Sequence, residues 1–419
     1  MRHPRQVLPP TLALIFALIV IPPTARAGQE GKGFVSVDES LRQGDLAAAE
    51  RQVAEKLQAD PGDDSLRFGL GMVRFLRAVE ARIQAFHRHG LGVNLMGMGG
   101  LTRLPVPPNP NPEPIDAAKA RTLLQAWVDD LAGVEATLAD IKSDAVKLPI
   151  HFALVRLDFD GDGTAGDEES LWKIYERMNG GQEGLEGAAR ELVVAFDRGD
   201  VDWLRGYCHL LSAMTEVVLA HDFAPWFEHS GHVFFAGAKP PQPFLDSREE
   251  REGNRFMSDV LDVVALIHQV RMDVAEPARL KAVLAHLEAM VALSRSTWKF
   301  IQAEADDDRE WIPNPKQHTV IGVAVTDEMI QGWHRFLDEF EAILQGRTLV
   351  PFWRGHQADR GINVRRVLLE PRPFDLVLWV QGTAAAPYLE RGEVSSTETW
   401  GRINRIFRGE FIGFAIWFN

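Results

Sequence analysis

Three aspartates at alternate positions offer the one chemistry that residue types and spacing specify in this sequence. Asp158, Asp160 and Asp162 are followed by Gly163, and Glu169 closes the run 158–169. Ca²⁺ is a hard cation that binds roughly six to eight oxygen ligands. Without a cation, so many acids in one short loop would repel each other. The run therefore predicts a calcium-binding loop.

Each predicted ligand has a definite place in this loop. Carboxylates occupy positions one, three and five, a backbone carbonyl serves position seven, and a bidentate carboxylate serves position twelve. The residues are Asp158, Asp160, Asp162, Thr164 and Glu169, respectively. Position nine is Gly166, so we expect a water molecule there. Gly163 at position six allows the sharp turn, because a positive φ is cheap only for glycine.

The run resembles the calcium loop of the EF-hand family, Asp-x-Asp-x-Asp-Gly with Glu at the twelfth position. That resemblance implies Ca²⁺ as the cofactor. The family usually carries a branched apolar residue at position eight, which pairs with a partner loop, whereas here the residue is Ala165. No second run of this pattern exists in the sequence. The resemblance thus implies one calcium site and not a paired sensor.

The family also places a helix on each side of the loop. Residues 149–157 begin with a proline suited to the first helical position and have apolar residues at helical spacing. The same residues are also consistent with a short strand. Residues 169–178 predict an amphipathic helix that starts at Glu169 and ends at an Asn-Gly-Gly turn.

The N-terminus predicts export. A basic start, an apolar run over 11–21 and the sequence Ala25-Arg26-Ala27 are typical of a secretory signal peptide cleaved after Ala27. An uncleaved anchor is the alternative. We therefore expect a periplasmic or secreted protein with no stable membrane insertion after cleavage, since no other stretch is long and apolar enough.

Charge and cysteine usage fit this location. The net charge is −14, and removal of residues 1–27 takes away three arginines and no acids. An acidic surface argues against nucleic acid as a partner. Cys208 is the single cysteine, so no internal disulfide is possible, which suits a bacterial periplasm. Outside the cytosol calcium is abundant enough to fill a weak loop.

The remaining sequence predicts a mainly α fold of helical hairpins and a bundle, with a small α+β C-terminal region. Residues 28–89 form a helical hairpin region whose Gly44-Asp45-Leu46 turn, Ala-rich second helix and Asp60-Pro61 stop resemble a tetratricopeptide repeat. An ordinary helix pair is the alternative. The predicted domains that follow are a Gly/Met- and Pro-rich linker, a helical domain and the α+β region, at 90–114, 115–345 and 346–419.

Periodicity predicts the individual elements. Helices are expected at 115–148, 185–194, 201–219 (capped by Asp200), 249–274, 277–301, 327–344 and 397–407. The helix over 249–274 carries a predicted core stripe of Val260, Leu261, Val263, Val264, Leu266 and Ile267. Strands are expected at 361–369 and 374–380. Residues 320–325 favour a strand or the start of a helix, and residues 411–417 a closing strand or a buried tail.

Two other groups could hold a cation. His209, His221, His229 and His232 lack the spacing of a known metal motif. We expect His221 and His229 to form hydrogen bonds with their acidic neighbours instead. The acidic run 304–308 lacks the glycine and final glutamate of a calcium loop, and we expect a solvated loop there.

The sequence indicates the function less specifically than it indicates the metal ion. No nucleophile elbow, Walker loop, dinucleotide fingerprint or zinc-protease motif is present. The favoured hypothesis is an exported calcium-binding protein acting as a structural or interaction module, with another protein or peptide as partner. A tetratricopeptide-like scaffold that docks peptides and an exported enzyme braced by calcium are the alternatives.

Overall fold

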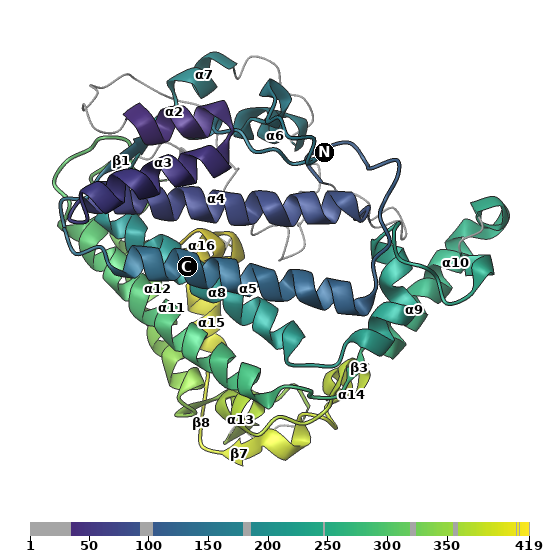
Figure 1. Cartoon of the computed structure of the whole chain (residues 1–419). Helices are drawn as coiled ribbons and strands as arrows, with labels where there is room; N and C mark the ends of the chain where they lie inside the picture. The colour runs from purple at the N-terminus through teal and green to yellow at the C-terminus, as the bar shows by residue number, and fades with distance from the viewer. Residues whose placement is uncertain are drawn as a thin grey trace, which may run out of the picture.

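The computed structural model of this protein is mainly helical, with a small region of short strands and helices near the C-terminus. The N-terminal helices lie at the top of Figure 1 and the strand region at the bottom. The structure describes residues 35–92, 104–178, 186–245, 248–318, 324–354, 359–407, 409 and 411–418. The predicted signal peptide 1–27, the loop residues 93–103 and the residues 319–323 lie outside this set.

The N-terminal region contains the expected helical hairpin. Helix α2 (Val35–Gln43) and helix α3 (Leu46–Ala59) are joined by a turn at Gly44, and helix α4 (Asp64–Arg88) follows. Asp45 caps α3 by accepting a hydrogen bond from the Ala48 N–H, and Asp63 caps α4 in the same way through Leu66. Helix α3 packs on α4, so the hairpin covers one side of the longer helix.

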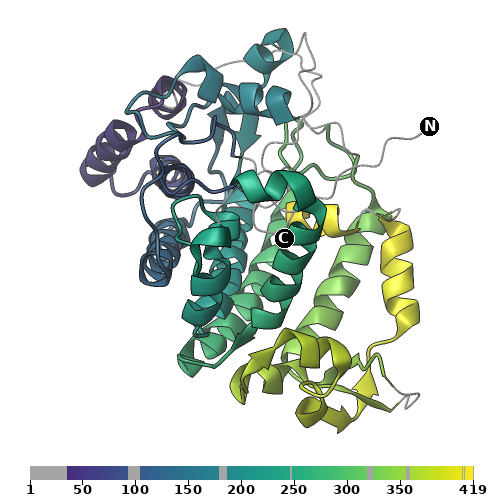
Figure 2. The same ribbon diagram turned by 90° about the vertical axis from the view of Figure 1, so that its right-hand side faces the viewer.

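Long helices then pack one against the next through the middle of the molecule. Helix α4 contacts α5 (Ala117–Ala139), α5 contacts α8 (Arg198–Leu219), α8 contacts α11 (Pro277–Ala303), and α11 contacts α12 (Asp327–Leu344). Seen from the side, the N-terminal helices lie on one flank and helix α15 (Thr397–Ile406) on the other (Figure 2). These helices were predicted, although α5 ends earlier than expected.

The predicted cap of α8 is wrong by one turn. Asp197 caps the helix through the Gly199 N–H at 2.8 Å, whereas Asp200 lies inside the first turn and accepts from the Asp197 N–H at 3.0 Å. The two aspartates form a reciprocal capping box, which buries both carboxyl groups. Both belong to an acidic cluster described below.

The segment before the calcium loop is not a helix. Residues Leu148–Ile150 form strand β1, which pairs antiparallel with strand β2 (Val194–Phe196), and a 3₁₀ turn follows at Phe152–Leu154. The strand alternative therefore holds only for the start of the segment 149–157. After the loop, helix α6 spans Leu171–Met178, so the second helix does not start at Glu169, which lies in a 3₁₀ turn. Helix α7 (Glu186–Glu191) is shorter than predicted.

Aromatic rings from distant segments fill the core beneath the loop. Phe152, Phe196 and Trp203 all pack against Trp311, with ring centroids 5.4, 5.9 and 5.9 Å from that indole. A cavity of about 40 Å³ lies among them and against α4. Leu157, Phe159 and Leu171 from the loop segment line it as well. The loop is therefore built on the core and does not project from the surface.

Helix α10 (Arg248–Gln269) projects from the body beside helix α9 (Ala224–Phe234) in Figure 1. Val263 and Leu266 pack against Val233 and Phe234. Of the other four predicted core residues, Val260 is half-buried, whereas Leu261, Val264 and Ile267 are 60%, 58% and 44% exposed, so the prediction is wrong for these three. Helical periodicity identified an apolar helix but not its packing partner.

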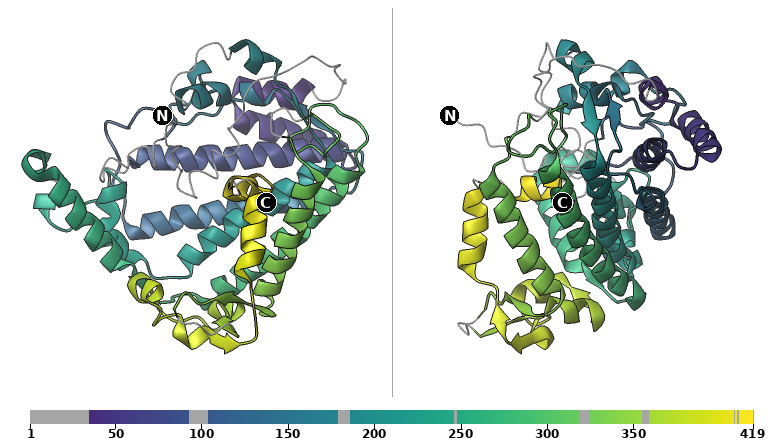
Figure 3. Two further views of the ribbon diagram at one scale, coloured as in Figure 1. Left: turned by 180° about the vertical axis from the view of Figure 1, so that it is seen from behind. Right: turned by 90° about the vertical axis from the view of Figure 1, so that its left-hand side faces the viewer.

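Two C-terminal segments differ from expectation. Residues 374–380, predicted as a strand, and residues 411–417, predicted as a closing strand or a buried tail, are mainly helical. Strand β6 is confined to Phe374–Asp375 and pairs with β3 (Arg271–Met272), after which α14 spans Leu376–Gln381. Residues Phe411–Phe418 form α16, whose Trp417 carbonyl accepts from the Trp203 indole N–H at 2.7 Å. The tail is therefore helical, with Trp417 buried but Ile412 74% exposed. In the view from behind, α15 lies alongside α12 (Figure 3).

A four-stranded sheet at the bottom of the molecule has the order β7-β5-β4-β8. Only the start of the predicted strand 361–369 belongs to it, because helix α13 (Val364–Leu369) follows β5. The strands are β4 (Thr348–Pro351), β5 (Arg360–Ile362), β7 (Leu389–Arg391) and β8 (Glu393–Val394). Within the described part of the chain, no helix is long and apolar enough to cross a membrane.

Candidate metal centre

The ends of the loop 158–169 are held together by backbone contacts. Leu171 donates its N–H to the Val155 carbonyl at 3.0 Å, and Arg156 and Ser170 form an isolated β-bridge. Because the chain enters and leaves at the same place, the residues between form a closed loop. A short antiparallel pairing thus does the positioning that an incoming helix was expected to provide.

The three aspartates converge as predicted. One carboxylate oxygen from each of Asp158, Asp160 and Asp162 lies within 4.8 Å of the other two. Asp158 accepts hydrogen bonds from the N–H groups of Gly161 at 2.8 Å and Gly163 at 3.0 Å. Both glycines have positive φ, +77° and +92°, which turns their amides toward that carboxylate.

The loop turn continues beyond the first aspartate in the same manner. Asp160 accepts from the Asp162 N–H at 3.1 Å, and Asp162 accepts from the Thr164 N–H at 2.8 Å. These contacts fix the side chains toward one centre while water still reaches them. Hard carboxylate oxygens arranged in this way suit Ca²⁺. The Thr164 carbonyl as a fourth ligand stays a prediction.

Glu169 is close to the loop but outside the group of three carboxylates. Its side chain is 8% exposed and accepts from the N–H groups of Phe159 at 2.7 Å and Gly166 at 3.1 Å. Burial raises the pKa of Glu169, and these two hydrogen bonds oppose the rise. Glu169 therefore holds the two halves of the loop together, and its bidentate ligation of Ca²⁺ stays a prediction.

Helix α4 supplies contacts that the sequence analysis missed. Glu80 accepts from the Asp158 N–H at 2.8 Å, Gln84 donates to the Asp158 carbonyl at 2.6 Å, and His87 Nδ1 lies 3.0 Å from the Asp160 carbonyl. Burial raises the pKa of Glu80 to about 7, against the hydrogen bond from Asp158. These three residues recur at helical spacing on one face, and that polar face was the available signal.

A second acidic cluster lies where α8 begins and α11 ends. One oxygen from each of Asp197, Glu304 and Glu310 lies within 4.8 Å of the other two. Burial, followed by the charge of Asp197, raises the pKa of Glu304 to about 9 and that of Glu310 to about 8. Burial also raises the pKa of Asp197, and that of Asp200 well above its ordinary value. We therefore expect Glu304 and Glu310 to hold protons at neutral pH.

The predicted solvated loop 304–308 is only partly solvated. Lys147 donates to Asp308 at 2.7 Å and also to Asp306, and both aspartates are about half exposed. Glu304 instead accepts from Gln317 at 3.1 Å and belongs to the buried cluster. The sequence could not reveal this, because Asp197 and Lys147 are far away along the chain.

The four histidines do not form a common site in the described structure. His221 and His229 donate to the carbonyls of Val217 and Pro225 at 2.7 and 2.8 Å, so the predicted pairs with acidic neighbours are wrong. A histidine ring can reach the backbone carbonyl four residues earlier in a helix. Both histidines use that carbonyl as acceptor, and not the side chain of the adjacent acidic residue. His209 contacts His286 instead, with the two Nδ1 atoms 2.8 Å apart.

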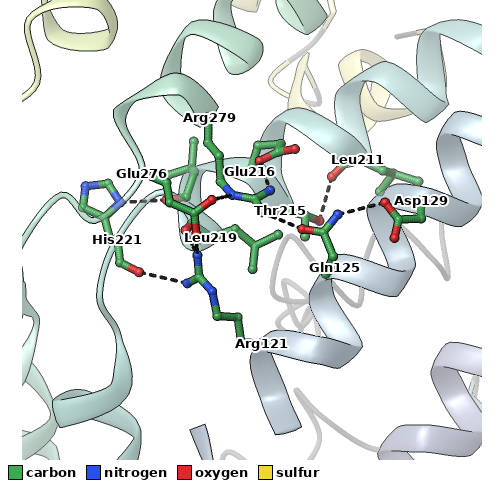
Figure 4. A network of polar contacts seen from close by, with 11 residues as sticks. Arg121, Gln125, Asp129, Leu211, Thr215, Glu216, Leu219, His221, Glu276 and Arg279 are labelled. Carbon is green, nitrogen blue, oxygen red and sulfur yellow. Dashed lines mark hydrogen bonds and ion pairs between the residues drawn. The ribbon is translucent and has the colours of Figure 1, made fainter. Parts of the chain in front are cut away.

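A further polar network joins α5, α8 and α11 (Figure 4). Arg279 donates to Glu216, Glu276 and Gln125 at 2.7, 2.7 and 2.6 Å. Arg121 donates to Glu276 and to the Leu219 carbonyl at the end of α8. Two guanidinium groups thus meet two carboxylates, which makes this network a link between helices and not a second cation site.

No family model, curated protein or solved structure matches this chain.

Proposed function

We propose that this protein binds one Ca²⁺ ion in the loop 158–169 and that the ion is a structural brace. One observation carries the proposal. The carboxylates of Asp158, Asp160 and Asp162 converge in a loop whose glycines adopt the required positive φ. Phe159 of the loop and Leu157 just before it line the core cavity, so fixing the loop would stabilise the surrounding helices.

We also propose that the protein is exported. The N-terminal basic and apolar segment supports export to the periplasm or beyond, where calcium is abundant. Single loops outside the cytosol bind with a Kd of roughly 10⁻⁴ to 10⁻³ M. At a Kd of about 10⁻⁴ M, a concentration of about 2 mM Ca²⁺ would stabilise the folded state by roughly 2 kcal/mol.

The test compares the loop with the acidic group of Asp306, Asp308 and Glu310. The double variant Asp158→Ala with Glu169→Gln removes a central ligand and the loop closure, and we expect it to lose stoichiometric Ca²⁺ binding while keeping its helical circular dichroism. The control is Asp306→Ala with Asp308→Ala, which removes the two exposed carboxylates of the group that Asp306 and Asp308 form with Glu310 and should keep binding. Equilibrium dialysis measures both. Binding that persists in the first variant and disappears in the second would place the ion near Asp306 and Asp308 and contradict our proposal.

A further inference from the structure

Position eight of the calcium loop faces the turn between α2 and α3. A Cβ atom built on Gly44 would lie 2.4 Å from the Ala165 Cβ and 3.3 Å from the Arg156 Cβ. Carbon atoms that pack without strain are about 3.5 to 4.0 Å apart. Gly44 has φ of +82°, so its conformation also favours glycine. The turn and the loop therefore fit together only because residue 44 has no side chain.

The contact extends along α2. The Arg156 N–H donates to the Leu41 carbonyl at 3.1 Å. Asp38 accepts from the His151 N–H at 2.7 Å and lies 2.9 Å from its Nδ1. Asp38 is buried, so these bonds are shielded from water. The hairpin is thus tied to the segment that enters the loop as well as to the loop itself.

Helix α4 holds the opposite side through Glu80, Gln84 and His87, as described above. The loop is therefore held between two parts of the N-terminal helical region. In EF-hand pairs, the partner at position eight is a second loop. The sequence contains no second loop of that pattern, and the residue seated against position eight here is Gly44.

We propose that the α2–α3 turn takes the place of a partner loop, so that Ca²⁺ binding and docking of the α2–α3 hairpin are coupled. The proposal rests on the proposed calcium site and assigns it a conformational role. Coupling between two events is reciprocal: Ca²⁺ binding favours hairpin docking by the same factor by which docking favours Ca²⁺ binding. Conversely, loss of Ca²⁺ loosens the hairpin.

The experiment is a Ca²⁺ titration of the wild-type protein and three variants. Gly44→Ala introduces both backbone strain and the clash with Ala165. Gly409→Ala is the matched control, because Gly409 has φ of +81° and no atom of the described residues within 4 Å of its built Cβ. Gly44→Ala combined with Ala165→Gly keeps the strain and removes the clashing methyl group. Circular dichroism checks that each variant is folded.

We expect Gly44→Ala to weaken Ca²⁺ binding roughly fivefold or more. Gly409→Ala should bind as the wild type does, and the combined variant should recover most of the lost affinity. Hydrogen exchange on the wild type gives a second readout: amides of α2 and α3 should exchange faster in chelator than in Ca²⁺.

The outcomes separate the two proposals. If the wild type binds no Ca²⁺, the calcium site and the coupling both fail. Wild-type binding with unchanged affinity in Gly44→Ala overturns the coupling alone and leaves the calcium site in place. Equal exchange rates of the α2 and α3 amides with and without Ca²⁺ also overturn it. If Ala165→Gly fails to restore the affinity lost in Gly44→Ala, the contact between residues 44 and 165 does not couple the turn to the loop, and the proposal is overturned.

Discussion

Three groups of three carboxylates lie in the described part of the chain, and two of them, the loop aspartates and the group of Asp197, Glu304 and Glu310, share no residue and differ in their surroundings. In both, one oxygen from each acid lies within 4.8 Å of the other two. Asp160 and Asp162 of the loop are exposed, whereas Asp197 and Glu310 are 8% and 2% exposed. Like charges at such distances need a counter-charge or a proton. An open group can recruit a cation from solution, while a buried group retains protons.

The two groups also differ in how their residues are supplied. The loop carboxylates come from five consecutive residues, so their spacing alone announces a site. The buried cluster joins α8 to the end of α11 and to the following segment, and its neighbour Lys147 comes from a third place in the chain. A group of carboxylates from one short loop can therefore be predicted from a sequence more easily than a buried cluster assembled from distant segments.

The largest expected effect concerns pH and the buried cluster. The folded-state pKa values of Glu304 and Glu310 are raised to about 9 and 8, above the unfolded value of 4.5. Stability from these groups is therefore fully present below about pH 4.5 and is lost as pH rises through 8 and 9. Solvent partly screens Glu304, so we expect a loss of about 3 kcal/mol, less than full linkage would give.

The variant Glu304→Gln with Glu310→Gln isolates this effect, because neutral amides cannot ionise. It should match the wild type near pH 5 and exceed it in stability near pH 9 in chelator, by urea denaturation. The surrounding charges are those of Asp197, Asp200, Asp306, Asp308 and Lys147. A variant less stable than the wild type at both pH values would mean that Glu304 and Glu310 are ionised in the folded protein.

A smaller effect is expected from Lys147, which acts as the counter-charge of Asp306 and Asp308. Lys147→Met should destabilise the calcium-free protein in chelator by about 1 kcal/mol, because the ion pairs of Lys147 with Asp306 and Asp308 are partly exposed to water. Millimolar Ca²⁺ should recover part of this loss by replacing the ammonium group among the carboxylates. The melting temperature with and without Ca²⁺ measures both changes. No difference from the wild type in the response to Ca²⁺ would argue that the lysine has no such role.

The smallest effect is expected from Gln84, whose amide donates to the Asp158 carbonyl. Gln84→Ala should lower Ca²⁺ affinity about two- to threefold, since a neutral hydrogen bond contributes about 0.5 to 1.5 kcal/mol and part of it is replaced by water. Gln125→Ala in the α5 network is the control, because Gln125 contacts Arg279 and Asp129 but not the loop. Calcium titration measures both variants. An equal fall in Ca²⁺ affinity in Gln84→Ala and Gln125→Ala would show that the contact of Gln84 with the loop does not support binding.

Local signals in the sequence predicted much of the fold. Helix α12 begins and ends where expected, with Thr326 as cap and Gly346 at φ +72° after it. Helix α14 was missed although Asp375 caps it through Leu378 and Gly382 follows it with φ +104°. A short run rich in valine and leucine fits a strand equally well, and these caps should have decided the matter.

The candidate site divides in the same way. The three aspartates were predictable because their chemistry is contiguous. The contacts from α4 and from Gly44 were not, since they bring together residues separated by most of the N-terminal region. The incoming helix was wrong because β1 pairs with β2, a contact that local periodicity cannot reveal. Tertiary pairing decided the conformation of that segment.

The most direct test of the central claim is a calorimetric titration of Ca²⁺ into the chelator-treated protein, with a melting curve at each end point. We predict one ion bound per chain and a rise in melting temperature of roughly 2 °C at about 2 mM Ca²⁺. No heat and no change in melting temperature at millimolar Ca²⁺ would contradict it. The loop 158–169 would then be an acidic turn, held by its own backbone amides.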